Sequence, residues 1–238
     1  MNIARVAPQS NATKTPAIVP ANISAERRLV ERVFERCGEV ITEACAASSV
    51  PPEFLGALVA NESSGYGDAT RFEPAVYRHL LAVAQGQSPS YGSINVTELD
   101  DEISGLLPPN DATLHARYLA PAFAANHSAR LQSLADDAVR QLATSWGYTQ
   151  IMGYHMVSHP GTVRQLLEPQ FHFRMAIRLL SAFAVDYQLD PALEFGELFR
   201  CWNTGRPYGR TFDPDYVVKG LQRMEIYRQL RRIRPAAR

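Results

Sequence analysis

One carboxylic acid stands at the end of an apolar helical pattern. Pro51 and Pro52 suit the start of a helix, because a proline at the first helical position loses no needed hydrogen bond. Four residues then share one helical face at i, i+3, i+4 and i+7: Leu55, Leu58, Val59 and Glu62. Gly65 and Gly67 are expected to stop the helix, because glycine adopts left-handed backbone readily. The pattern therefore places Glu62 where a buried face opens into a loop.

That position predicts proton-transfer chemistry. A carboxyl group partly removed from water has a raised pKa and can donate a proton near neutral pH. Protonation of a glycosidic oxygen needs a group of this kind. The alternative is that Glu62 caps the helix or pairs with one of the many arginines, since structural ion pairs also perturb pKa values.

A second unusual stretch covers residues 145–154 (Ser-Trp-Gly-Tyr-Thr-Gln-Ile-Met-Gly-Tyr). Gln150 stands among apolar neighbours, so its amide must find hydrogen-bond partners, and a ligand is one source of them. The equal alternative is a core segment in which the protein itself satisfies the glutamine.

Composition and spacing argue against several other functions. The chain has 238 residues and a formal net charge of zero, which gives no general reason to expect a nucleic-acid partner. His155 and His159 have i, i+4 spacing, but Pro160 follows at once and no acidic residue lies between them, so we expect no metal and no cofactor. The cysteines are expected to be buried free thiols: Cys37, Cys45 and Cys201.

The apolar periodicity predicts a mainly α protein. Helices are expected at about 25–46 (capped by Ser24 and kinked or split at Gly38), 52–62, shortly after residue 74, 131–144, 162–167, 170–188, 195–202 and 215–230. On the last helix the predicted apolar side is Tyr216, Val217, Leu221, Met224 and Tyr227. Residues 86–112 are the least regular segment, with a small β-hairpin and a strand at 93–97.

The expected organisation is a disordered leader (1–23), a single catalytic domain (24–232) with an insertion at about 68–143, and a basic tail (233–238). No apolar run is long enough to span a membrane. The leader is polar and has no apolar core, so it does not have the composition of a standard secretory signal.

Four segments, in order, resemble the lysozyme-like superfamily and its soluble lytic transglycosylases. Residues 45–55 (Cys-Ala-Ala-Ser-Ser-Val-Pro-Pro-Glu-Phe-Leu) run into 61–65 (Asn-Glu-Ser-Ser-Gly), similar to a helix pair with a Glu-Ser signature. Residues 147–152 (Gly-Tyr-Thr-Gln-Ile-Met) resemble a Gly-Leu-Met-Gln-Ile segment. Residues 201–205 (Cys-Trp-Asn-Thr-Gly) resemble a Tyr-Asn-Ala-Gly motif, and 216–221 (Tyr-Val-Val-Lys-Gly-Leu) a closing Tyr-Val helix.

The spacing departs from the transglycosylases, because roughly eighty residues separate the first two motifs. In this respect the chain looks more like the N-acetylmuramidase domains of phage endolysins, which carry a similar Phe-Glu segment and a Ser-Trp-Gly-(Leu/Tyr)-x-Gln-Ile-Met-Gly run. Here these are residues 72–74 (Phe-Glu-Pro) and 145–153. Glu73 is therefore the candidate second carboxylate, and its alternative is an ion pair with Arg71 or Arg78.

The resemblance implies a lysozyme-like α+β fold with helices around a glycan cleft. It implies cleavage of the β-1,4 bond between N-acetylmuramic acid and N-acetylglucosamine, with Glu62 as the acid. The implied catalytic residues are Glu62 and Glu73, and the implied substrate-binding residues are Ser63, Tyr148, Gln150, Met152, Trp202, Asn203 and Tyr216.

The product is open. A second carboxylate that positions water gives hydrolysis, whereas attack by the sugar's own 6-hydroxyl, with Glu62 alone as acid and then base, gives an anhydro sugar. The alternative function is a non-catalytic, peptidoglycan-binding or envelope-structural protein of the same fold. We expect a monomer that is made in the cytoplasm and reaches the cell wall through holin-type release or dedicated export.

Overall fold

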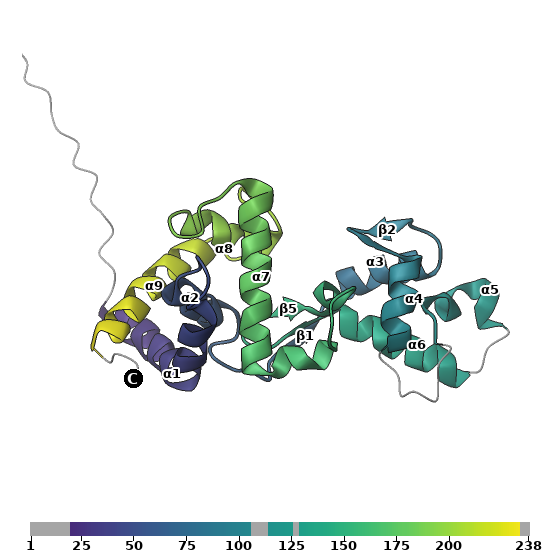
Figure 1. The fold of residues 1–238 in the computed structure, drawn as a ribbon, viewed down its shortest axis with the longest axis horizontal. Helices are drawn as coiled ribbons and strands as arrows, with labels where there is room; N and C mark the ends of the chain where they lie inside the picture. The colour runs from purple at the N-terminus through teal and green to yellow at the C-terminus, as the bar shows by residue number, and fades with distance from the viewer. Residues whose placement is uncertain (1–19, 106–113, 126–128, 234–238) are drawn as a thin grey trace, which may run out of the picture.

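The structure, a computed structural model, describes residues 20–105, 114–125 and 129–233 and has two lobes (Figure 1). The large lobe contains helices that contact one another in sequence-distant pairs: α1 (Pro20–Cys45), α2 (Pro52–Glu62), α7 (Pro169–Tyr187), α8 (Phe195–Thr204) and α9 (Tyr216–Ile233). Two 3-10 turns precede α7: η2 (Gly153–Met156) and η3 (Val163–Leu167).

The small lobe is built by the segment between α2 and the later motifs. Its helices are α3 (Pro74–Ala84), α4 (Val96–Gly105), η1 (Ala116–Leu119), α5 (Pro121–Ala124) and α6 (Ala129–Leu142). A two-stranded antiparallel hairpin joins α3 to α4: β2 (Ser90–Tyr91) and β3 (Ile94–Asn95). The predicted insertion therefore has a structure of its own.

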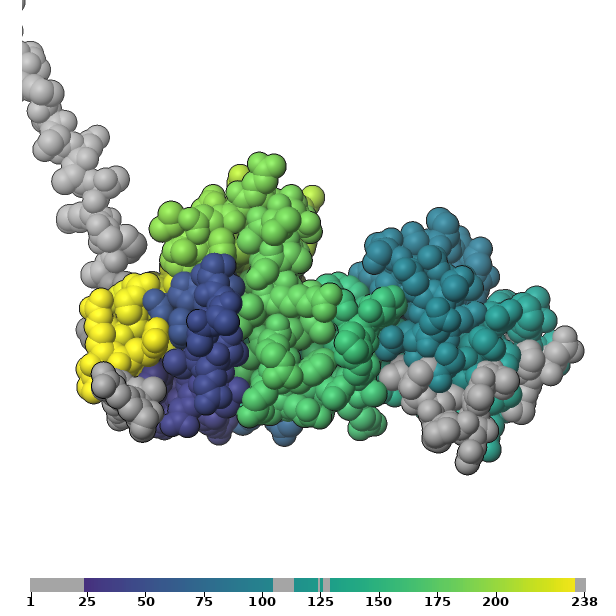
Figure 2. All heavy atoms as spheres, in the orientation of Figure 1, coloured from purple at the N-terminus to yellow at the C-terminus, as the bar shows by residue number. Residues whose placement is uncertain are grey.

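A three-stranded antiparallel sheet lies between the lobes: β1 (Thr70–Phe72), β4 (Thr144–Trp146) and β5 (Ile151–Met152) (Figure 1). The strand order is β1-β4-β5, and Phe72 pairs with Thr144 at the end nearest the small lobe. Figure 2 shows a broad hollow on this face of the molecule, between the part of the large lobe that holds α7 and α8 and the small lobe.

Helix α2 is the centre of the large lobe. Its predicted apolar face is buried, and burial extends around the helix to every residue from Phe54 to Ala60. The reason is that α1 and α9 both pack against it. Glu62 is the last residue of this buried helix, so its carboxyl group lies deeper than a one-sided stripe predicts.

The prediction of a mainly helical fold with a small hairpin is confirmed, whereas the strands of the central three-stranded sheet were not predicted. Several details were wrong. Helix α1 begins at Pro20 and is not capped by Ser24, and it continues through Gly38 without interruption. Leu221 on α9 is exposed, and Asn203 belongs to α8.

Other differences concern short elements. Val96 and Thr97 open helix α4 and are not part of a strand, and β1 was not predicted. The calls on leader residues 1–19 and on tail residues 234–238 lie outside the described residues, whereas residues 20–23 are helical. Among the described helices, none combines the length and apolar character that a bilayer span requires.

Candidate active site

Glu62 has the environment of a proton donor. Burial raises the pKa of its carboxyl group to about 7, while the hydrogen bond from Tyr216 and the positive charge of Arg71 act in the opposite direction. The Tyr216 hydroxyl donates to Oε1 of Glu62 in a short hydrogen bond. The carboxyl group is thus half protonated near neutral pH and has a partner that stabilises its ionised form.

Tyr216 is held in place by hydrogen bonds within the large lobe. Its carbonyl oxygen accepts a hydrogen bond from Asn61 Nδ2 at 3.1 Å. The buried Arg223 donates to Asn61 Oδ1 at 2.7 Å and forms an ion pair with Glu26 at 2.7 Å. This clamp of Glu26, Arg223 and Asn61 fixes the end of α2 against the start of α9. Sequence reasoning missed it, although Arg223 follows Tyr216 by seven residues and so shares its helical face.

Ser63 and Gly65 shape the loop after α2, Ser63 through a hydrogen bond and Gly65 through its left-handed backbone. Ser63 Oγ donates to the carbonyl oxygen of Tyr148 at 2.6 Å. Ser64 and Gly65 have positive φ angles of 56° and 87°, so the prediction for Gly65 is confirmed. Gly67 does not adopt left-handed backbone. It is required for another reason, because a Cβ there would lie 2.5 Å from the Tyr148 ring.

Gln150 is satisfied by the protein itself. Its Oε1 accepts from Ser145 Oγ at 2.8 Å, and its Nε2 donates to the carbonyl oxygens of Gly147 at 2.8 Å and Ala69 at 3.1 Å. The side chain therefore joins the β4–β5 turn to the segment before β1. Its backbone has a left-handed φ of 56°, which is uncommon for a residue other than glycine. These contacts match the alternative of a satisfied glutamine in a packed segment.

A buried histidine ties the same turn to the large lobe. His172 on α7 donates from Nδ1 to the Leu166 carbonyl at 2.7 Å, and its Nε2 accepts from the Thr149 backbone N–H at 2.9 Å. Trp202 Nε1 donates to the Thr149 carbonyl at 2.9 Å. Burial lowers the pKa of His172 to about 4, so the ring is neutral at pH 7. His172 is thus a packed histidine whose two ring nitrogens are both satisfied by the protein.

Arg71 connects the two candidate carboxylates. Its guanidinium bonds Oε1 of Glu73 through Nε at 2.6 Å and Nη2 at 2.5 Å, and its charge also acts on Glu62. The Glu73 backbone N–H donates to the Ala143 carbonyl at 2.8 Å, which places Glu73 directly after the β1–β4 ladder. Arg71 thus interacts with both candidate carboxylates, and the ion pair of Glu73 with Arg71 that was the alternative interpretation is present.

The other predicted site residues occupy separate positions. Met152 lies in β5, paired with Ser145 and partly buried. Asn203 is exposed on α8. All three cysteines are buried free thiols, as expected. Within the described ranges no three His, Cys, Asp or Glu side chains gather as metal ligands would.

Comparisons with known proteins give no relative: no family model, no curated protein and no solved structure matches this chain. The chemistry must therefore be inferred from the site. The site contains the Glu62 carboxyl group, whose pKa is about 7, and the Tyr216 hydroxyl, which is hydrogen-bonded to it. It also contains Arg71, whose positive charge acts on both Glu62 and Glu73.

Proposed function

We propose that this protein cleaves the glycan strands of peptidoglycan at the β-1,4 bond between N-acetylmuramic acid and N-acetylglucosamine. The observation that carries the proposal is Glu62, a carboxyl group at the end of a buried helix whose pKa is raised to about 7. Its interaction with Arg71, a residue of β1 in the small antiparallel sheet between the two lobes (Figure 1), supports the proposal. The sequence resemblance to lysozyme-like enzymes names the substrate.

The first step is general acid catalysis. Protonated Glu62 donates its proton to the glycosidic oxygen as the bond from that oxygen to the anomeric carbon breaks, and the bonding electrons stay with the oxygen. Glu62 becomes a carboxylate in this step. The Tyr216 hydroxyl and the positive charge of Arg71 both favour the carboxylate form. They therefore stabilise the group as its charge develops, which is when stabilisation lowers the barrier.

The second step depends on Glu73. Both bonds from Arg71 go to Oε1, and within the part of the chain that the structure describes no hydrogen bond to Oε2 is formed. That oxygen is available to orient a water molecule, which supports hydrolysis. If Glu73 takes no part, Glu62 acts as the base in turn and the 6-hydroxyl of the sugar attacks to give an anhydro product.

Mass spectrometry of the fragments released from purified peptidoglycan tests the proposal and separates the two products. Fragments with reducing-end muramic acid mean hydrolysis, and fragments lighter by one water mean anhydro chemistry. We expect Glu62→Gln to lower the rate by at least about a hundredfold, because it removes the proton donor. Glu39→Gln, which changes an exposed glutamate on α1, should keep the wild-type rate.

Two outcomes would count against the proposal. Unchanged lysis by Glu62→Gln would remove the acid from the mechanism. Absence of any fragments with a folded wild-type protein, together with binding to peptidoglycan sacculi, would favour the non-catalytic glycan-binding protein instead.

A further inference from the structure

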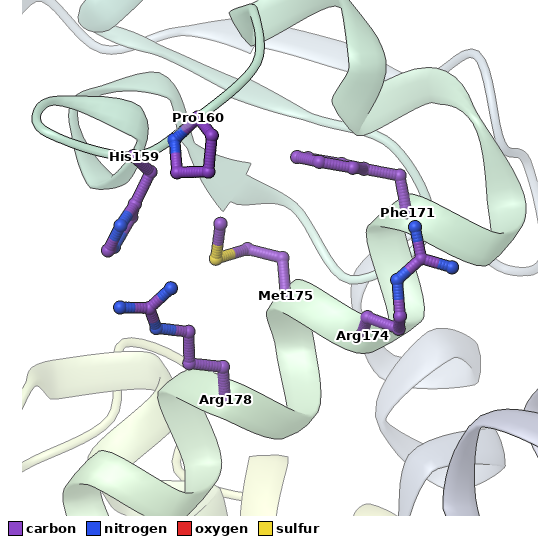
Figure 3. A pocket seen from close by; sticks show the side chains of 6 residues that line it. All are labelled: His159, Pro160, Phe171, Arg174, Met175 and Arg178. Atoms are coloured by element: carbon purple, nitrogen blue, oxygen red, sulfur yellow. The ribbon is translucent and has the colours of Figure 1, made fainter.

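A cavity of about 160 Å3 opens on α7, away from the residues assigned above to proton transfer. Figure 3 shows its lining, which comes from α7 and from the loop before η3: His159, Pro160, Phe171, Arg174, Met175 and Arg178. The rings of Pro160 and Phe171 and the thioether of Met175 form apolar walls. The two guanidinium groups and the imidazole of His159 supply the polar atoms at the edge (Figure 3).

The two arginines are exposed and have no acidic partner. Arg174 and Arg178 are four residues apart on α7, and Figure 3 shows their guanidinium groups on opposite sides of Met175, that of Arg178 beside His159 and that of Arg174 beside Phe171. Among the described residues neither forms an ion pair. Arg174 lies over the Phe171 ring, with its guanidinium carbon 6.0 Å from the ring centre. Two uncompensated cations beside an apolar hollow create a positive potential that an anion would neutralise.

His159 experiences that potential. Burial and the charge of Arg178 both lower the pKa of its imidazole, and Figure 3 shows the Arg178 guanidinium next to the His159 ring. The loop that carries His159 is fixed before any ligand arrives: the His159 N–H donates to the Met156 carbonyl at 2.8 Å, and Thr162 and Gln165 form a capping box on η3. The wall of the cavity opposite α7 is therefore preformed.

We propose that this cavity binds a carboxylate that carries a small apolar group. The Arg178 guanidinium beside His159 matches a carboxylate, since its planar N–H donors can form two parallel hydrogen bonds to the carboxylate oxygens, and Arg174 adds a second positive charge on the other side of Met175. The apolar walls suit a methyl-sized substituent, and the volume suits a ligand of about one amino-acid residue. In peptidoglycan this chemistry occurs at the alanine carboxylates of the stem peptides, an identification that rests on the proposed function.

The test is a titration followed by NMR with three probes: N-acetyl-D-alanine, its uncharged amide, and inorganic phosphate. We expect N-acetyl-D-alanine to shift the signals of His159 and Met175, and the amide to bind about tenfold more weakly, because it lacks the charge that the arginines pair. Phosphate should also bind more weakly, since it makes no use of the apolar walls. Equal binding of the amide or of phosphate, or no binding of N-acetyl-D-alanine, would overturn the proposal.

Variants assign the binding to the cavity. Arg178→Gln should weaken binding of N-acetyl-D-alanine about tenfold, because it removes the paired guanidinium, and Arg174→Gln should weaken it by a smaller factor, because it removes only the more distant charge. Arg164→Gln, which changes an exposed arginine of η3 outside the lining, should leave it unchanged. Loss of binding in the Arg164 variant, or none in the other two, would exclude this cavity. Glycan cleavage by the wild type and probe binding by Glu62→Gln test the two proposals separately. If the wild type does not cleave glycans but Glu62→Gln binds N-acetyl-D-alanine, the proposed activity fails and the binding site stands.

Discussion

Glu62 is subject to opposing influences, and their balance sets its pKa. Burial favours the protonated acid, whereas Tyr216 and Arg71 favour the carboxylate. A general acid works best when its pKa lies near the working pH, because it must be protonated before the step and must also release the proton. Burial without Tyr216 would leave an acid that holds its proton too strongly.

Replacement of Tyr216 by phenylalanine tests this balance. The variant loses the hydrogen bond that lowers the pKa of Glu62, so the pKa should rise. Because the active form is the protonated acid, activity falls as the pH rises through this pKa, and the alkaline limb of the pH–rate profile should move to higher pH. The rate below that limb should fall about tenfold, because the carboxylate formed in the reaction loses its donor.

The matched control is Tyr208→Phe, which removes the hydroxyl of a tyrosine that is 85% exposed in the loop before α9. Its profile should overlay that of the wild type. An alkaline limb that stays in place or moves to lower pH in Tyr216→Phe would contradict the role given to the phenol.

Sequence reasoning finds the reacting groups better than the groups that hold them. Glu62 follows from helical spacing, because a carboxyl group on an apolar face is locally anomalous. The clamp of Glu26, Arg223 and Asn61 joins three helices, and no local pattern indicates which distant acid an arginine will meet. Gln150 is a mixed case: its need for partners was evident, and only the structure supplies Gly147, Ala69 and Ser145 as those partners.

At the scale of elements, α2 and α9 pack against each other at close range in the large lobe. A Cβ at Gly56 would lie 2.2 Å from the Tyr227 ring, and Tyr227 is completely buried. The two helices can approach to this distance only because residue 56 has no side chain. Since α2 ends in Glu62 and α9 begins at Tyr216, the same contact fixes the position of the Glu62 carboxyl group relative to the Tyr216 hydroxyl.

Gly56→Ala should therefore destabilise the protein by about 2–3 kcal/mol, the usual cost of overfilling a packed core. Urea unfolding followed by circular dichroism measures it. The control is Gly196→Ala on α8, where a Cβ would lie 3.6 Å from its nearest neighbour, Val217. That change should be neutral or stabilise by up to about 1 kcal/mol, because alanine is the better helix former. Equal effects of the two variants would show that the α2–α9 contact can relax.

The missed helix shows what local signals were available. Helix α4 follows an irregular stretch rich in glycine and proline, which pointed to loop and strand. Yet Asn95 Oδ1 accepts from the backbone N–H groups of Thr97 and Glu98, and Glu98 Oε2 accepts from the Asn95 N–H at 2.8 Å. This reciprocal cap is visible in the sequence as Asn-x-x-Glu. The short strand β1 had no such signal, because it exists through pairing with β4, which is far along the chain.

At the scale of the whole molecule, four partly or fully buried groups couple folding to pH in opposite directions. Burial raises the pKa values of Glu62 and Glu102 from 4.5 to about 7, so each lowers the stability of the fold as pH rises from 4.5 to 7. Burial lowers the pKa values of His155 and His172 from 6.5 to about 4, so each lowers stability as pH falls from 6.5 to 4. For Glu62, His155 and His172 each contribution is about 3 kcal/mol, and that of the half-exposed Glu102 is smaller, because solvent screens its charge.

The opposing contributions of these groups to the free energy of unfolding should therefore partly cancel between pH 4.5 and 6.5 in the wild type. Glu62→Gln removes a contribution to stability that decreases as pH rises. The free energy of unfolding of this variant, relative to the wild type, should therefore increase by about 3 kcal/mol from pH 4.5 to 6.5. His172→Gln should show the opposite slope, whatever its overall loss of stability. Urea titrations at several pH values measure both, and parallel curves for the three proteins would contradict the coupling.

The register of β1 and β4 shows where the small lobe joins the sheet. Phe72 and Thr144 are paired residues on adjacent antiparallel strands, so the small lobe leaves the sheet and returns to it at neighbouring points. Paired residues of this kind lie about 5 Å apart, a gap that an ordinary hairpin turn of two residues bridges. The small lobe is thus inserted between two paired residues of adjacent strands, Phe72 in β1 and Thr144 in β4. A two-residue turn that joins Phe72 directly to Thr144 would therefore keep the β1–β4 pairing in register without the small lobe.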